Sequence, residues 1–169
     1  MSRKVPLSGK AVCPPIELVS YSGTVVRFHK PMRINRPFES HVRGLEQIVH
    51  DTAVEVYGRP PSTIVHLGAF YCRRISTWPY LVSEHGLGNA IDIGGVRFDR
   101  LAAGSWPEAP SRWRQQFSVG MSQHWKDDGK NPEHARFLRL VARRLIEREG
   151  LFRVILGPAH PNHANHLHL

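Results

Sequence analysis

The sequence predicts an α+β domain in which a small antiparallel sheet is packed by two main helices. Two long segments repeat apolar residues at helical spacing, and several short segments between them are rich in β-branched and aromatic residues. The 169 residues suit one domain, and 41% hydrophobic with 22% charged residues is typical of a globular protein. No stretch approaches the roughly 20 apolar residues of a membrane helix, so no membrane span is expected.

Residues 1–38 contain five prolines and little periodicity, so we interpret them as an irregular lead-in segment that wraps the domain. One short strand is predicted within them, at Thr24–Phe28. Between residues 42 and 56, apolar residues recur at helical spacing. They predict an amphipathic helix, which ends at Gly58 and the two prolines that follow.

Three further segments are predicted as strands from their β-branched and aromatic residues: 62–72, 88–98 and 151–156. Residues 101–130 are rich in Gly, Pro, Ser and Trp and predict a long loop that carries a short helix. A second main helix is expected to begin at Asn131, with proline in its first position, and to end at Gly150.

The chain closes with HPNHANHLHL, which holds four of its eleven histidines. The last five residues predict a short strand, in which side chains alternate between the two faces. His166 and His168 would point to one side, while Leu167 and Leu169 would face the core. Two histidines on one sheet face suit a metal site, although the same pattern also fits a polar outer face.

A second candidate segment for metal binding is SEHGLGNAID, residues 83–92. In it, His85 is followed by two glycines that permit a tight turn, and then by a strand with Asp92. Zinc takes histidine nitrogens and carboxylate oxygens as ligands, and catalytic zinc sites keep water in the fourth position. Two histidines and one aspartate therefore form a suitable ligand set if the two segments meet.

These motifs resemble a known family. SEHGLGNAIDI resembles the SxHxxGxAxD signature of the zinc peptidases related to D-Ala-D-Ala carboxypeptidases, lysostaphin and the hedgehog signalling domain. Together with YCRR, FLRLV, VILGP and HANHLHL, it is most similar to the bacterial extensin-like C-terminal domain family, over residues 40–169. The closing HxxHxH also resembles the ending of penicillin-insensitive murein endopeptidases.

The resemblance implies a zinc peptidase-like domain over residues 39–169, with zinc held on the sheet face by His85, Asp92 and His168. In the carboxypeptidase branch a glutamate shortly before the last ligand is the general base, but residues 150–169 contain none. His166 is therefore our first candidate for the base or the transition-state stabiliser, and His163 at the rim is the second. Neutral imidazole near physiological pH suits proton transfer.

The superfamily also uses an arginine after the preceding strand to hold a substrate carbonyl and the developing oxyanion. Arg73 is our choice for this role by its place next to Cys72. Arg74 is the alternative, and a solvated surface charge is the other interpretation of both.

The implied activity is hydrolysis of amide bonds in peptidoglycan peptides, as endopeptidase or carboxypeptidase, by a monomer in the periplasm or outside the cell. The N-terminal residues lack the apolar run of a signal peptide. This fits a protein that stays inside, a trimmed leader or another export route.

Other functions remain open at this stage. The net charge of +9 suits an anionic partner such as a wall polymer, but also solubility alone. A non-catalytic cell-wall-binding module that keeps the metal is the main alternative, and a structural zinc site would need a fourth ligand such as His163. Nucleic-acid binding is not expected, because the basic residues are scattered and no nucleic-acid module is recognisable.

The cysteine content is low and gives no support to a thiolate zinc finger, because the chain has only Cys13 and Cys72 and no CxxC motif. In an oxidising compartment the two cysteines would form a disulfide. Two unrelated buried thiols fit the sequence equally well.

Overall fold

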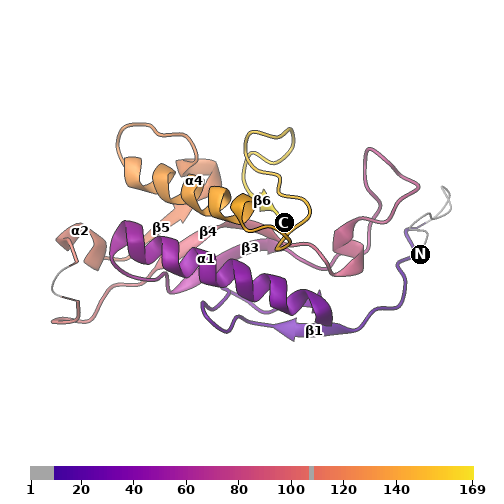
Figure 1. Ribbon diagram of the computed structural model, residues 1–169, viewed down its shortest axis with the longest axis horizontal. Helices are drawn as coiled ribbons and strands as arrows, with labels where there is room; N and C mark the ends of the chain where they lie inside the picture. Colours follow the sequence, from indigo (N-terminus) through magenta and orange to yellow (C-terminus); the bar gives the residue numbers. More distant parts are fainter. Residues whose placement is uncertain (1–9, 107–108) are drawn as a thin grey trace.

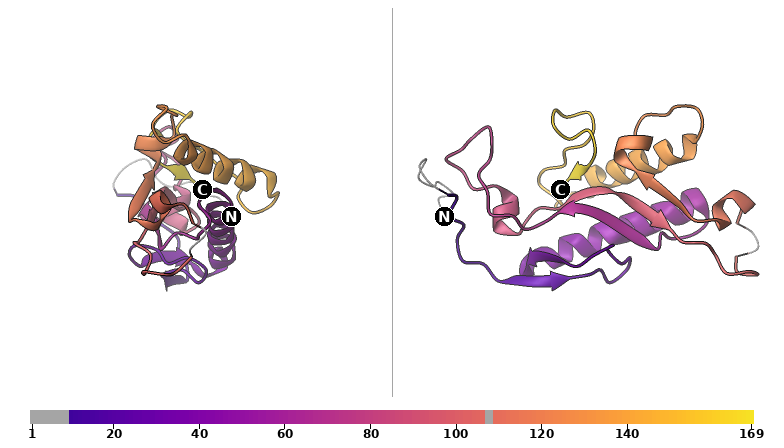
Figure 2. Two further views of the ribbon diagram at one scale, coloured as in Figure 1. Left: turned by 90° about the vertical axis from the view of Figure 1, so that its left-hand side faces the viewer. Right: turned by 180° about the vertical axis from the view of Figure 1, so that it is seen from behind.

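The computed structural model describes residues 10–106 and 109–169 and confirms the α+β class with two main helices. Helices α1 (Glu39–Tyr57) and α4 (Pro132–Glu147) lie together on one face of the main sheet (Figure 1), which the view from behind shows in front of them (Figure 2). The strands of this sheet are β3 (Thr63–Gly68), β4 (Asp92–Phe98), β5 (Phe117–Gly120) and β6 (Leu167–His168). Strand β4 pairs antiparallel with each of the other three.

Helix α1 forms because its apolar residues fall on one side of the helix. Val42, Leu45, Val49 and Ala53 are spaced by three or four residues and are all buried in the core. The helix ends at Gly58, which has the left-handed φ of 74° and donates its N–H to the carbonyl of Val54. The predicted first helix is therefore confirmed, together with its stop signal.

The second predicted helix is confirmed as α4, with Asn131 before it and proline at its start. Its apolar face, with Leu138, Val141 and Leu145, joins the same buried core as α1. At one end of this core, the Tyr57 ring lies 5.0 Å from the rings of both Phe98 and Trp113. These aromatic contacts join α1 to the sheet and to the short helix α2 (Ser111–Arg114).

The lead-in segment is more regular than predicted in its described part. Strands β1 (Leu18–Tyr21) and β2 (Met32–Asn35) form an antiparallel pair, and η1 (Arg36–Phe38) leads into α1. The predicted strand at Thr24–Phe28 is wrong, because the backbone N–H groups of residues 24–26 turn inward to the buried Glu46 carboxylate at 2.6–3.1 Å. Only Phe28 makes a single bridge, to Ile64.

Two other predictions are corrected. Residues 151–156 are not a strand, because only Leu156 pairs with the sheet, through an isolated bridge to His168. The region 101–130 is not only a loop with one helix: its described part includes β5, α2 and a further short helix, α3 (Met121–His124). β5 extends the sheet beside Gly95–Phe98.

A disulfide joins Cys13 to Cys72, with their Cα atoms 5.8 Å apart. Of the two interpretations that the sequence left open, the structure shows the cross-link. It ties the extended N-terminal segment to the chain that follows β3. Within the described residues, no helix has the length and apolar character that crossing a membrane requires.

Candidate metal centre

Strand pairing brings the two candidate segments together. The antiparallel register of β4 and β6 places Asp92 directly opposite His168, so the two side chains lie on one face of the sheet. His85 comes from the 3-10 turn η2 (Glu84–Leu87). Ser83 caps the start of this turn, and Gly88 caps its end. Gly88 has φ 65°, and a Cβ there would stand 2.6 Å from the Asn35 nitrogen. Glycine is therefore required to fold this turn against β2.

The three side chains form a compact group of potential ligands. His85 Nε2 lies 3.2 Å from His168 Nδ1 and 3.3 Å from Asp92 Oδ2, and His168 Nδ1 lies 2.8 Å from Asp92 Oδ1. Ligand atoms about 2.1 Å from a tetrahedral zinc ion are separated from one another by about 3.4 Å. The group fits such an ion in both chemistry and spacing, and its donor atoms all lie within 4.8 Å of one another.

The orientation of His85 is fixed by a backbone carbonyl. Its Nδ1 lies 2.5 Å from the Ala69 oxygen, and the imidazole is almost fully buried. If Nδ1–H donates to this carbonyl, Nε2 has its lone pair directed at the group. Metal-binding histidines in proteins are usually held by such a contact. The sequence could not reveal this partner, because a backbone carbonyl has no residue signature.

The electrostatics keep Asp92 ionised. Burial would raise the pKa of Asp92, but the hydrogen bonds from His168 and His85, with the nearby imidazoles, outweigh it and hold its pKa below the ordinary value. For His166, burial is the main influence and lowers its pKa despite the attraction of Asp92. The site therefore keeps Asp92 as a carboxylate and favours the neutral form of the adjacent His166. An ionised carboxylate is the form in which aspartate binds a metal ion.

The two other histidines predicted for the site lie beside the group. His166 Nε2 is 3.6 Å from Asp92 Oδ1. The His163 ring lies 5.0 Å from the His166 ring and 5.8 Å from the His168 ring. Asn165, which the sequence did not single out, has its Oδ1 2.8 Å from His166 Nδ1 and would accept a hydrogen bond from an Nδ1–H there. That contact leaves His166 Nε2 as the atom that faces Asp92.

Arg73 is exposed and lies on a stretch that pairs with the segment before His85. The Ser83 N–H donates to the Arg73 carbonyl, and Arg74 lies opposite Val82. In such a pairing Arg73 shares a face with Ser83, whereas Arg74 lies on the opposite face. Among the described residues, no hydrogen bond or ion pair joins the Arg73 side chain to His85, Asp92 or His168, so the structure does not assign its role.

A hollow of about 580 Å³ borders the metal group. Its lining includes His168, Leu169 and Ala90, together with the aromatic residues Phe38 and Phe152. An ion pair between Glu84 and Arg153, at 3.1 Å, also belongs to its wall.

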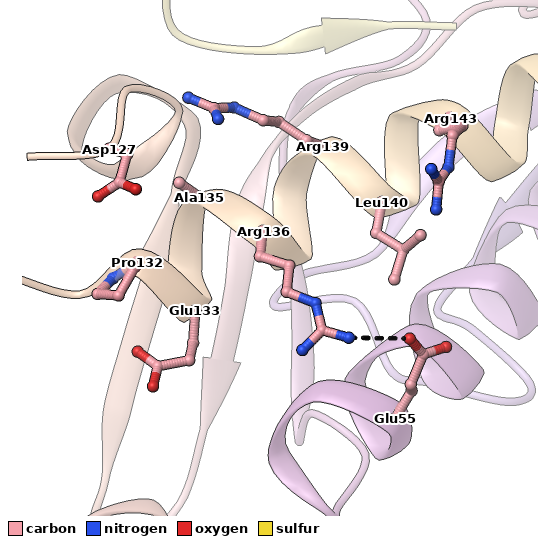
Figure 3. A pocket seen from close by; sticks show the side chains of 9 residues that line it. All are labelled: Glu55, Asp127, Pro132, Glu133, Ala135, Arg136, Arg139, Leu140 and Arg143. Carbon is pink, nitrogen blue, oxygen red and sulfur yellow. Dashed lines mark hydrogen bonds and ion pairs between the residues drawn. The ribbon is translucent and has the colours of Figure 1, made fainter. Parts of the chain in front are cut away.

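A second hollow, of about 630 Å³, lies elsewhere, between α1 and α4 (Figure 3). Its lining holds as many acidic residues as arginines: Arg136, Arg139 and Arg143 with Glu55, Asp127 and Glu133. Arg136 reaches across to Glu55, at 3.3 Å, whereas Arg139 points away from this pair. None of the three predicted metal ligands lines it, whereas His168 lines the first hollow.

The family model for the extensin-like protein C-terminus matches residues 2–169 of this chain. The chain belongs to the extensin-like C-terminal family. The match covers the extensin-like domain from the lead-in segment to the last histidines, so both segments of the metal group lie within the family region. No curated protein and no solved structure matches this chain.

Proposed function

We propose that this extensin-like domain is a zinc-dependent peptidase that hydrolyses amide bonds in peptidoglycan peptides. The observation that carries the proposal is the convergence of His85, Asp92 and His168, whose donor atoms lie within 4.8 Å of one another. The resemblance of SEHGLGNAIDI to the signature of zinc peptidases supports the activity and the substrate class. The disulfide supports a periplasmic or extracellular location, because such bonds persist in oxidising compartments.

Zinc is the ion that best matches this donor set, since two imidazoles and one carboxylate leave a fourth tetrahedral position for a water. When bound, it would polarise an amide carbonyl and acidify that water. The chain supplies the remaining functions. His166, neutral and 3.6 Å from Asp92, is placed to accept a proton at Nε2 and to deliver it to the leaving amine. His163 is the second candidate for this transfer.

Arg73 would hold the substrate from the rim. The residue is exposed and belongs to the stretch that pairs with the segment before His85. A guanidinium there would bind a carboxylate or carbonyl of the substrate and support the oxyanion. The hollow beside His168, with its aromatic wall, would accommodate the peptide.

One observation favours a second function, that of a wall-binding module which keeps the metal without turnover. Residues 150–169 contain no glutamate to act as the base of the carboxypeptidase branch. The two functions differ in what His166→Ala would change. For a peptidase, this variant keeps its zinc and loses peptide release.

The test measures zinc content and the release of peptides from purified sacculi, with mass spectrometry of the products. His50→Ala on α1, which removes a histidine paired with Asp51, is the matched control and should behave as the native chain. Zinc binding without release from any wall preparation would favour the binding module. Failure to bind zinc would refute both functions.

A further inference from the structure

A hairpin next to the metal ligands exposes three aromatic side chains. Tyr71, Trp78 and Tyr80 are 68%, 52% and 42% exposed, and they lie in residues 71–82, which we call the aromatic hairpin. Backbone hydrogen bonds from Ile75 to Leu81 and from Leu81 to Trp78 shape its tip. The hairpin projects from one end of the molecule, beyond β3 (Figure 1), and the view from behind shows the same projection (Figure 2). Such clustered exposure of large side chains marks an interaction surface.

The base of the aromatic hairpin is tied to the metal centre. The Tyr71 N–H donates to the carbonyl of the predicted ligand His85 at 3.1 Å. The second arm of the hairpin ends at residue 82, three positions before His85. The disulfide to Cys13 anchors the first arm of the hairpin at Cys72. Cys13 Sγ lies 2.8 Å from where a Cβ on Gly86 would stand, so the cross-link packs on the turn that presents His85. A molecule bound along the hairpin is therefore held beside the metal ligands.

The side chains of the hairpin indicate what kind of molecule it would bind. It contains Arg73 and Arg74 and no Asp or Glu within residues 70–83. The faces of aromatic rings are electron-rich and attract the C–H groups on the face of a sugar ring, whose hydroxyl groups lie around its edge. Arg73, which is exposed, can pair with a carboxylate on the same polymer. A chain of sugar rings whose peptide branches carry free carboxylates matches both features.

We propose that the aromatic hairpin binds the glycan strand of the wall polymer and so presents the attached peptide to the metal centre. This inference rests on the proposed function, which supplies the polymer. Because the base of the hairpin lies beside His85, a glycan strand bound there would bring its peptide branch near the metal ligands.

The test is calorimetric binding of a β-1,4-linked N-acetylglucosamine hexamer, a peptide-free probe. The native chain binds it, and the double variant Trp78→Ala/Tyr80→Ala binds it about tenfold more weakly, because two stacking surfaces are lost. Trp106→Ala is the matched control, since Trp106 is also 42% exposed but belongs to another segment, and it keeps the native affinity. With sacculi as substrate, the double variant raises KM.

No binding of the hexamer by the native chain, or equal binding by the double variant, would overturn the inference. Binding to phosphatidylglycerol vesicles that the double variant loses, without hexamer binding, would identify a lipid surface instead. The two proposals fail separately. A chain that binds the hexamer through the hairpin but releases no peptide refutes the peptidase alone, whereas release without hexamer affinity refutes the hairpin site alone.

Discussion

Replacing both Cys13 and Cys72 by serine removes a cross-link between residues 59 positions apart. A disulfide stabilises a fold mainly by restricting the unfolded chain, and a loop of this length corresponds to about 4 kcal/mol. This is a large share of the roughly 5–15 kcal/mol that stabilises a typical domain. Since 1 kcal/mol shifts the melting temperature of a domain of this size by about 3 °C, we expect a decrease of about 12 °C.

The assay is guanidinium denaturation of the native chain and the double serine variant, followed by far-ultraviolet circular dichroism. Reductant should lower the stability of the native chain to that of the variant, and it should leave the variant unchanged. A thiol titration of the oxidised native chain should find no free cysteine. A difference in unfolding free energy below about 1 kcal/mol would refute the assigned role of the cross-link.

Two other predictions concern the fold. Burial lowers the pKa of His134 to about 4, below its ordinary 6.5, so the neutral form is favoured in the folded state. Stability should be complete above pH 6.5 and should decrease by about 3 kcal/mol as the pH falls to 4, and His134→Gln should remove this dependence if the account is right. Gly88→Ala and Gly58→Ala both place alanine at a left-handed φ, but only at Gly88 would the new Cβ clash, with the Asn35 nitrogen. Denaturation should show a loss of about 1 kcal/mol for Gly58→Ala and at least about 2 kcal/mol more for Gly88→Ala; equal losses would contradict the packing of η2 on β2.

The helices could be predicted from the sequence because their apolar periodicity reflects a buried stripe. Val42 and Leu45 belong to the buried stripe of α1, and Gly58, which has a left-handed φ, ends the helix. The four-residue strands β1, β2 and β5 could not be predicted, because so short a strand shows no clear alternation. Residues 151–156 resemble a strand in sequence because they contain several apolar residues, but they are not one. The Phe152 ring packs on the Phe38 ring, with centroids 6.0 Å apart, and only Leu156 pairs with the sheet.

The ligand types of the candidate site could be predicted because each has a side chain suited to zinc. What the sequence could not provide is the register of β4 against β6, which places Asp92 opposite His168. It also could not provide the Ala69 carbonyl that orients His85 or the Asn165 side chain beside His166. These partners depend on long-range pairing, and amide or carbonyl groups of this kind occur throughout any chain.

The most direct test is a zinc titration of the metal-stripped chain, with competition by a chelator to obtain the affinity. The native chain should bind one zinc ion, and Asp92→Asn and His168→Ala should each weaken that binding by at least about a hundredfold while His50→Ala leaves it unchanged. Zinc affinity that is the same in all four proteins would contradict the metal centre assigned to His85, Asp92 and His168.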